Sequence, residues 1–389
     1  MKIIGARLVC LVMLVACTSG PRPPIATPGD RPAQDGQVPV ARWDRIEPDG
    51  VQLAKSVTDV VATGRDDGWA VGYHYAEVED EPLDGVLVRV GLRGWRAVER
   101  MDKRFPRAEQ TSMRAVDAHG TGYAWAVGNA YLVNDVVPFA LRWDGIAWHT
   151  LTPLGSKPDQ QFTDVAIDGP RAVLTALRGN RSLLLSWNGE RLQRLVSERG
   201  ERFESVAARG GRTWIAGGQS PGTCEQTRPA VWHRPTSQTA ALEPMRLPEL
   251  GTGMLTQILQ IDVANVWAVG ERGTGTACDH DGHGTPLVLH WNGTVWQEVP
   301  LPGEGGRLTG ITAAGPNDVW LAGVRDGHGV SLWHYDGRSW TREAMTFEAD
   351  LEWAESRAAL TIVPGTSQLW LAGSTGRDFD RHVAIYRRL

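Results

Sequence analysis

The stretch that decides the fold lies between residues 265 and 296. It reads Asn265-Val-Trp-Ala-Val-Gly270 and, after a loop-like interval, Leu289-His-Trp-Asn-Gly-Thr-Val-Trp296. An Asn-Gly pair between two apolar runs is the strongest short signal for a β-hairpin, because glycine accepts the positive φ of a tight turn. This stretch therefore predicts three short antiparallel strands in succession.

The first of these strands recurs along the chain. The copies are Trp69-Ala-Val-Gly72, Trp125-Ala-Val-Gly128, Trp214-Ile-Ala-Gly217, Trp267-Ala-Val-Gly270, Trp320-Leu-Ala-Gly323 and Trp370-Leu-Ala-Gly373, with Leu174-Thr-Ala-Leu177 as a degraded seventh. The first and last Trp are 301 residues apart over six intervals, a mean of about 50. Short strands repeating at this period are typical of a β-propeller.

Each repeat divides into four strands, which we call a to d. The spacing from a to b and from c to d is short and uniform, whereas the spacing from b to c varies from 10 residues (Leu177 to Trp187) to 21 (Gly270 to Trp291). We therefore expect an all-β, seven-bladed propeller of four-stranded antiparallel blades. Its a–b and c–d turns form one face, and its longer b–c and d–a connections form a loop-rich face, where binding tends to occur. The expected blades span about 56–99, 113–151, 162–196, 203–247, 255–299, 308–344 and 358–389.

The last repeat ends at its third strand, residues 382–389. Residues 40–47 (Val-Ala-Arg-Trp-Asp-Arg-Ile-Glu) are similar to the fourth strands around Trp296 and Trp340. We predict that this N-terminal segment supplies the outer strand of blade 7 and closes the ring, which leaves no free sheet edge. The alternative is an isolated strand on an open solenoid.

The first 16 residues have the pattern of an export signal. Lys2 and Arg7 precede an eight-residue apolar run, and Leu14-Val-Ala-Cys17 resembles a bacterial lipobox. That resemblance implies a signal peptide over residues 1–16 and acylation of Cys17, a palmitate-type anchor to the cell membrane on its extracytoplasmic side. Residues 17–39 contain six Pro and predict a disordered tether. The alternative is an ordinary secretory leader cleaved elsewhere.

Two cysteines fall in the b–c loops of neighbouring blades, Cys224 in blade 4 and Cys278 in blade 5. Since an exported protein folds in oxidising surroundings, we predict a disulfide between them. A free pair and a metal-binding pair are the alternatives.

Polar loops on the same face offer weak candidates for binding. Asp279, Asp281, His280 and His283 contain donor types suited to Ca²⁺ or a transition metal, but the default interpretation is a solvated loop without cofactor. Acidic side chains on the loops of blades 1 and 7 are candidates for the binding face: Glu77, Glu79, Asp80, Asp84, Asp378, Asp380 and the neighbouring His382.

Composition excludes some classes of function. The 389-residue chain carries a net charge of −5, which argues against a nucleic-acid partner, and its 17 Trp fall at repeat positions with one exception, which indicates packing between blades. We expect no G-x-S-x-G nucleophile elbow, no H-E-x-x-H motif and no sialidase-type Asp-box, and we assign no catalytic residue.

Over about 350 residues the repeats resemble secreted bacterial propellers with "DVWAVG…LHWNGTxW" units, and 265–296 is the nearest copy. The resemblance implies fold and export, and a propeller fold does not choose a function. We expect a monomeric, membrane-anchored extracytoplasmic module that binds an envelope protein or glycan on its loop-rich face without catalysis. The alternative is a glycan hydrolase or lyase that uses carboxylates at the propeller mouth.

Overall fold

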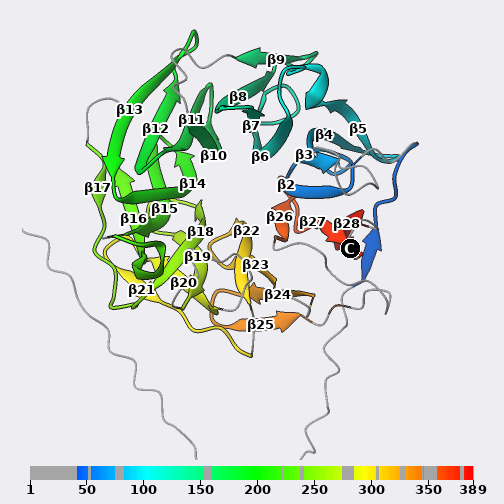
Figure 1. Cartoon of the computed structure of the whole chain (residues 1–389). Coiled ribbons are helices and arrows are strands. Elements are labelled where there is room, and N and C mark those ends of the chain that lie inside the picture. The colour runs from blue at the N-terminus through cyan, green and yellow to red at the C-terminus, as the bar shows by residue number, and fades with distance from the viewer. Residues whose placement is uncertain are drawn as a thin grey trace, which may run out of the picture. The chain divides into compact units, whose positions relative to one another are not determined.

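The computed structural model describes residues 42–50, 54–74, 83–151, 159–220, 222–236, 241–273, 284–303, 306–324, 329–343, 345, 357–376 and 381–388. Contact clustering separates residues 1–39 from a compact unit at 40–389. Within the second unit, 28 strands form seven four-stranded antiparallel sheets arranged as a ring (Figure 1). The prediction of a seven-bladed β-propeller is confirmed.

The first four blades are built from consecutive strands. Blade 1 comprises β2 (Ser56–Gly64), β3 (Asp67–His74), β4 (Asp84–Gly91) and β5 (Gly94–Arg100). Blade 2 comprises β6 (Gln110–Ala118), β7 (Ala124–Leu132), β8 (Asp135–Trp143) and β9 (Trp148–Leu151). Blade 3 comprises β10 (Gln160–Asp168), β11 (Arg171–Arg178), β12 (Arg181–Trp187) and β13 (Leu192–Arg199). Blade 4 comprises β14 (Glu201–Arg209), β15 (Arg212–Gln219), β16 (Arg228–Arg234) and β17 (Glu243–Pro244).

The remaining blades follow the same order until the chain end. Blade 5 comprises β18 (Gly253–Gln260), β19 (Val266–Arg272), β20 (Thr285–Trp291) and β21 (Trp296–Glu298). Blade 6 comprises β22 (Arg307–Gly315), β23 (Asp318–Val324), β24 (Val330–Tyr335) and β25 (Trp340–Glu343). Blade 7 comprises β26 (Ala359–Ile362), β27 (Leu369–Thr375), β28 (His382–Arg388) and β1 (Trp43–Arg45), in the spatial order β1-β28-β27-β26. Two 3₁₀ turns, η1 (Met101–Lys103) and η2 (Cys224–Gln226), complete the elements.

The N-terminal strand closes the ring as predicted. β1 runs antiparallel to β28, with Trp43 opposite Arg388 and Arg45 opposite Tyr386. The chain then passes to blade 1, where the Asp49 amide donates to the Trp95 carbonyl at 2.6 Å and the Trp95 amide donates to the Glu47 carbonyl at 3.0 Å. One short segment therefore pairs with the last blade and the first, as the blue and red strands of Figure 1 show.

Steric crowding explains why the repeated motif ends in glycine. In six blades the inner strand carries a β-bulge opposite this residue, or opposite its equivalent Ala176 in blade 3. A Cβ on Gly72 would lie 1.8 Å from the Ser56 carbonyl oxygen, and one on Gly270 would lie 2.0 Å from that of Met254. Only glycine allows this close approach of two backbones.

The register corrects one detail of the repeat in blade 3. Val165 pairs with Leu174, as Val60 pairs with Ala70, so the residue equivalent to Trp69 is Val173 and the degraded copy is residues 173–176. The predicted copy, residues 174–177, was one residue too late. The reason is that β2 contains a second bulge before its turn, which β10 lacks.

The core consists of seven apolar clusters among the described residues, and each lies between two neighbouring blades. A Trp on the second strand of one blade meets aromatic side chains of the next. Trp69 meets Trp148 edge-on at 4.9 Å between ring centroids, and Trp267 meets Trp340 at 5.6 Å. These tryptophans thus pack between blades, as their periodicity predicted.

The lengths of the connections do not separate the two ends of the ring as cleanly as the spacing suggested. The b–c turns of blades 2 and 3 contain two residues each, 133–134 and 179–180, whereas the c–d connection of blade 4 spans residues 235–242. We keep the name loop-rich face for the end where the b–c and d–a connections lie. No helix of the described chain is both long and apolar enough to cross a bilayer.

Candidate binding site

A cavity of about 540 Å³ occupies the centre of the ring. All seven inner strands contribute to its wall, through residues such as Asp59, Asp164 and Gln257. It extends toward the a–b turns, where His119 and Arg209 line it. The inner strands start at the opposite, loop-rich face, so that the first residues of each strand surround the channel mouth on that side.

One position of the inner strands shows how the blades are tied together. At the bulge, four blades carry a threonine whose hydroxyl donates to a carbonyl of the next blade. Thr58 donates to Met113, Thr163 to Phe203 at 2.9 Å, Thr256 to Leu308 and Thr309 to Ala358 at 3.2 Å. The hydroxyl groups of these threonines therefore join each blade to the next.

Two blades place charged residues at this same position. In blade 2 the bulged residue is Arg114, between the pairs Met113–Gly128 and Ala115–Val127, and in blade 4 it is Glu204. In blade 2 the bridging role passes to Asn129, whose side-chain oxygen accepts from the Phe162 amide at 2.8 Å. Arg114, the bulged residue of blade 2, is therefore not needed for the hydrogen bond that joins blade 2 to blade 3.

Blade 7 shows no bulge in its described register, where Ala359 pairs with Ala372. The fully buried Ala358 accepts the Thr309 hydroxyl, as Met113, Phe203 and Leu308 accept the threonines of the blades before them. Ala358 is therefore the blade 7 equivalent of these buried apolar residues. Arg357 directly precedes it, as Arg202 precedes Phe203 in blade 4 and Arg307 precedes Leu308 in blade 6.

Arg114, Arg357, Arg202 and Arg307 form a group that we call the arginine cluster, and each lies in or just before an inner strand. Arg202 Nε donates to Glu204 Oε1, and Arg307 Nε lies 3.6 Å from Oε1 of Glu271, whose side chain is 1 % exposed. Glu204 and Glu271 thus lie among these arginines as acidic partners.

The charges of the cluster act on one another. Burial lowers the pKa of Arg114, and the nearby charge of Arg357 lowers it further. Burial is the largest single influence on the pKa of Glu204 and raises it, but the charges of Arg202, Arg357 and Arg114 together outweigh burial and lower it. The charge and hydrogen bond of Arg202, with the charges of Arg357 and Arg114, therefore favour the ionised form of Glu204.

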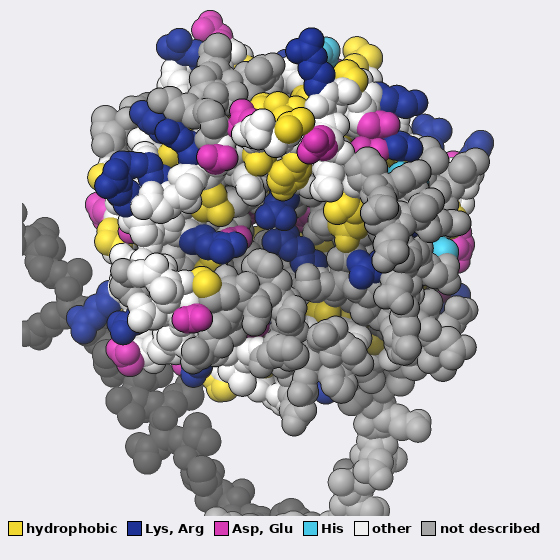
Figure 2. Space-filling model, viewed as in Figure 1, with side chains coloured by type: hydrophobic (Ala, Val, Ile, Leu, Met, Phe, Trp, Pro, Cys, Tyr) yellow, Lys and Arg dark blue, Asp and Glu magenta, His cyan; other side chains and the backbone are white. Residues whose placement is uncertain are grey.

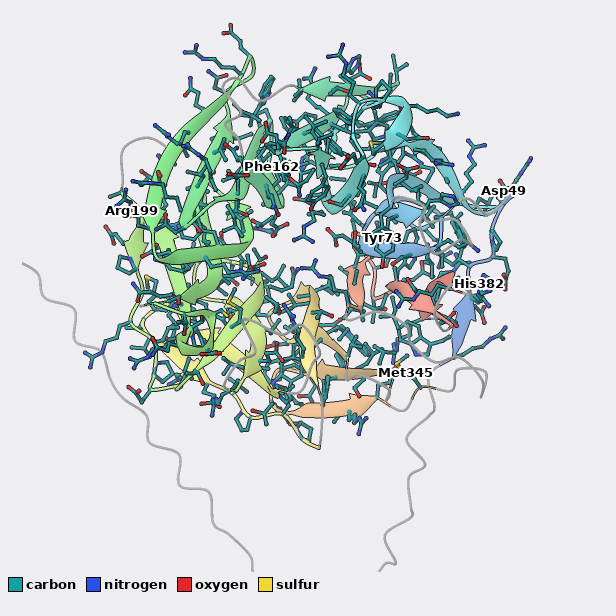
Figure 3. All side chains as sticks on the ribbon, viewed as in Figure 1. Asp49, Tyr73, Phe162, Arg199, Met345 and His382 are labelled. Carbon is teal, nitrogen blue, oxygen red and sulfur yellow. The ribbon has the colours of Figure 1, made fainter. Side chains whose placement is uncertain are left out.

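The pictures agree with this placement. Dark-blue side chains gather at the centre of the ring in Figure 2, although the chain as a whole is acidic. Nitrogen-tipped side chains reach from the inner strands toward the centre in Figure 3, whereas Arg199 lies at the outer edge of blade 3.

Deeper in the channel, three carboxylates join neighbouring inner strands. Asp59 accepts from the Val60 and Val116 amides at 2.9 Å each, and Asp164 and Asp117 accept from pairs of amides in the same way. Burial raises the pKa of Asp59 and Asp117 to about 7 and that of Asp164 to about 6, although the amide donors oppose the shift. Both oxygens of each carboxylate are thus engaged by backbone.

The residues predicted for the binding face are only in part described. Asp84 begins β4, is 7 % exposed and forms an ion pair with Arg100. His382 begins β28 and is half-buried (Figure 3), and Cys224 lies in η2. The other candidates lie outside the described residues, as do Cys17 and the predicted partner of Cys224: Glu77, Glu79, Asp80, Asp378, Asp380, Cys278, Asp279, His280, Asp281 and His283. Those assignments stay predictions.

Among the described residues, no three His, Cys, Asp or Glu side chains are grouped so that they could hold a metal ion.

The expectation that the chain lacks the G-x-S-x-G pattern is wrong at the level of the sequence. Residues 218–222 read Gly-Gln-Ser-Pro-Gly, which has the spacing of that nucleophile elbow. That elbow is a sharp strand-to-helix turn. Here Ser220 follows β15 and precedes the short η2, and its hydroxyl donates to the Thr223 carbonyl at 2.5 Å. Ser220 therefore lies in the b–c connection of blade 4, with its hydroxyl bonded to the backbone.

Sequence patterns did not indicate the arginine cluster, because its members come from blades 2, 4, 6 and 7. A signal was present, however. Aligning the inner strands of the six bulged blades leaves Arg114 and Glu204 as the residues that break the Thr column.

Comparisons with known proteins support the fold. No protein-family model matches the sequence, and no curated protein matches it significantly. Among solved structures, the chain is similar to YCF48 bound to D1 peptide, with 16% identity, a TM-score of 0.55 and coverage of 89% of this chain and 95% of that one. It is also similar to a PL25 ulvan lyase bound to its saccharide (11%, 0.56, 89% and 96%) and to a chain of the mitotic checkpoint complex (11%, 0.55, 94% and 98%). At these identities the likeness defines the class, a seven-bladed β-propeller, and nothing narrower.

Proposed function

We propose that this chain is a membrane-anchored, extracytoplasmic binding module that performs no catalysis and holds a protein partner on its loop-rich face. The observation that carries the proposal is the arginine cluster at the channel mouth on that face. Arg114 and Glu204 stand there at the bulge, where four other blades carry a threonine that bridges to the next blade. Such a break in local consistency is expected where a surface is used.

Two of the similar structures illustrate binding by this fold. One holds a peptide, and another belongs to a multiprotein complex. A third is a polysaccharide lyase, so that the fold is compatible with the alternative function as well. Against a lyase stands the state of the channel carboxylates, because Asp59, Asp117 and Asp164 already accept two backbone hydrogen bonds each.

The anchor and the disulfide complete the proposal. Acylation at Cys17 would hold the propeller on the membrane, and a Cys224–Cys278 bond would join the b–c loops of blades 4 and 5. Mass spectrometry of the mature protein tests both: we expect an acylated N-terminal Cys17 peptide and a crosslinked Cys224–Cys278 peptide that separates on reduction.

A direct test of function compares binding with turnover. The purified full-length protein is incubated with a panel of anionic and neutral polysaccharides, and new reducing ends and unsaturated products are measured. We expect no turnover. In parallel, crosslinking in intact envelopes should join a protein partner to the loop-rich face. Sustained turnover of any polysaccharide contradicts the proposal and favours the enzyme.

A further inference from the structure

The cavity at the centre of the ring has acidic side chains in its wall. Its volume of about 540 Å³ lies within the range of small-molecule sites, roughly 300–1,000 Å³. Asp59 of blade 1, Asp117 of blade 2 and Asp164 of blade 3 line it and are only partly buried. Among the described residues, none of these three carboxylates forms an ion pair.

The negative charge of Asp117 is not required to join its blade to the next. Its carboxylate accepts the Ile167 amide of blade 3 at 2.7 Å. At the same register of blades 6 and 7, Thr312 and Thr361 accept the corresponding amide of the next blade with a neutral hydroxyl, at 3.1 Å each. Packing of the blades therefore explains an acceptor at this register but not a charge.

The same comparison applies to the other two carboxylates. Asp59 and Asp164 accept the Val116 and Val206 amides of the next blade, at 2.9 Å and 2.8 Å. Ser205, at the same register in blade 4, accepts the Ile258 amide of blade 5 at 3.2 Å and also lines the cavity. A hydroxyl thus suffices here as well, and blades 1 to 3 bring three charges to the wall that the joints between blades do not need.

Gln260 is a further polar group in the wall that packing does not explain. It is 6 % exposed, and its side-chain oxygen is buried without a hydrogen-bond partner among the described residues. The other six blades carry an apolar residue at this register: Ala62, Ala118, Ile167, Ala208, Ala313 and Ile362. A buried amide without a partner is unfavourable, and it can turn toward a ligand without breaking a hydrogen bond.

The rest of the wall limits the kind of ligand. Apolar side chains alternate with the polar groups or complete the lining: Val116, Val165, Ile258, Ile311 and Leu360. No three potential metal ligands of the described chain are grouped closely enough to hold a metal ion. A single small ion therefore lacks ligands here, whereas positive groups separated by hydrocarbon match carboxylates separated by apolar wall.

The positive groups near the cavity leave it open to a cation. His119 and Arg209 line its end at the a–b turns, and both are exposed, so that water screens the charge of Arg209. The charge of Arg357 acts on Asp59 and Asp164, but Arg357 is not part of the wall. The accessible end thus lies at the a–b turns, opposite the loop-rich face.

We propose that the central cavity binds a linear aliphatic amine with two or more ammonium groups, which enters from the face of the a–b turns. Its ammonium groups donate to the carboxylates of Asp59, Asp117 and Asp164, and one N–H donates to the side-chain oxygen of Gln260, turned toward the cavity. An ammonium has only donors, and a carboxylate retains free lone pairs after accepting two amides. The methylene chain contacts the apolar wall. The site is separate from the partner surface of the proposed function.

The test is isothermal titration calorimetry of the purified full-length protein at pH 8, above the raised pKa values of the three carboxylates, about 7, 7 and 6. The probes are 1,4-diaminobutane, spermidine, n-butylamine and 1,4-butanediol. We expect both polyamines to bind, butylamine to bind at least fivefold more weakly than the diamine, and the neutral diol not to bind. Salt should weaken the binding of the polyamines.

The variants assign the binding to the cavity. Asp117→Thr introduces the residue of blades 6 and 7, which preserves the hydrogen bond between blades, and should weaken diamine binding at least fivefold. Gln260→Ala introduces the apolar residue of other blades and should weaken it at least threefold, whereas Gln260→Glu should strengthen it. Gln297→Ala, an exposed position on β21 of the same blade, is the matched control with unchanged affinity.

Three results overturn the inference: no binding of either polyamine, which would leave a water-filled channel; equal affinity for the diamine and butylamine; or an affinity in Asp117→Thr and Gln260→Glu equal to that of the wild type. The proposed function is judged separately by crosslinking to a partner on the loop-rich face, so that either conclusion can fail while the other stands.

Discussion

At the scale of single residues, close backbone approaches decide which side chains the ring accepts. Gly94 begins β5 with φ +134°, and a Cβ on it would lie 2.2 Å from the Glu47 carbonyl oxygen. That carbonyl accepts the Trp95 amide in the contact between the N-terminal segment and blade 1. Gly94 therefore belongs to the closure of the ring as well as to its own turn.

Replacing Gly94 tests this close approach. We expect Gly94→Ala to lower the free energy of unfolding by about 2–4 kcal/mol, since it adds a steric clash to an unfavourable φ. Gly120→Ala is the control, because Gly120 has φ +67° with open space around its Cβ, and should cost only about 1–2 kcal/mol. Urea unfolding of both variants measures the difference, and equal costs would show that the Glu47 contact is unimportant.

The channel carboxylates predict a dependence of stability on pH. The native pKa values of Asp59 and Asp117 are raised to about 7 and that of Asp164 to about 6, all above the ordinary value of 3.8. Between pH 4 and 7 the folded state thus binds more protons than the unfolded state, and the free energy of unfolding falls as pH rises. We expect the protein to be more stable at pH 5 than at pH 8.

Urea unfolding across this pH range measures the effect. Asp117→Asn should flatten the dependence. The exposed Asp336→Asn, whose carboxylate has a pKa lowered by hydrogen bonds from the Ser339 and Arg338 amides, should leave the slope between pH 5 and 8 unchanged. Stability that rises steadily from pH 5 to pH 8 in the wild type would contradict the assignment.

At the scale of elements, β1 is the strand whose loss would open the ring, because it completes the sheet of blade 7. Trp43 packs against the cluster between blades 6 and 7, and its indole N–H donates to Glu343 at 3.1 Å. Ile46, 7 % exposed, contributes to the cluster between blades 7 and 1. This segment thus contributes to two interfaces at once.

Removing residues 40–47 should therefore destabilise the protein by about 3–6 kcal/mol, the burial of two large apolar side chains. It should also free an edge of β28 and promote association. Thermal unfolding and light scattering measure the two effects, and deletion of residues 30–37 is the length-matched control. A melting temperature equal to that of the control would mean that the ring does not need this strand.

At the scale of the whole molecule, we expect the charged channel mouth to lower the stability of the propeller. Four arginines and two glutamates share this partly buried region. Sites shaped for binding commonly cost stability, which substitutions can recover. The arginine cluster therefore predicts a trade-off between stability and binding.

Arg114→Thr should raise the free energy of unfolding by about 0.5–2 kcal/mol, because it removes a guanidinium whose charge is disfavoured by burial and by the charge of Arg357. Differential scanning calorimetry measures the change, and Arg199→Gln, on the outer strand, should leave stability unchanged. A loss of stability in Arg114→Thr would indicate that the arginine is a structural residue.

Much of this architecture follows from patterns in the amino-acid sequence. Asn-Gly and Asp-Gly hairpins, the Trp-Ala-Val-Gly strands and their period of about 50 residues indicated the number of blades. The similarity of residues 40–47 to other fourth strands indicated where the ring closes, which the register of β1 with β28 confirms. These features are local or periodic, and such patterns are readable in a sequence because each strand repeats the same hairpin and packing requirements.

The candidate site was decided by the tertiary structure. Arg114, Arg202, Arg307 and Arg357 are separated by up to 243 residues, and no spacing rule relates them. They come into one region because the ring brings the starts of all inner strands to one mouth. The sequence by itself determined the blades, since strand periodicity is a short-range property. Only closure of the ring determined which charges share a site, since electrostatic interaction depends on distance in space.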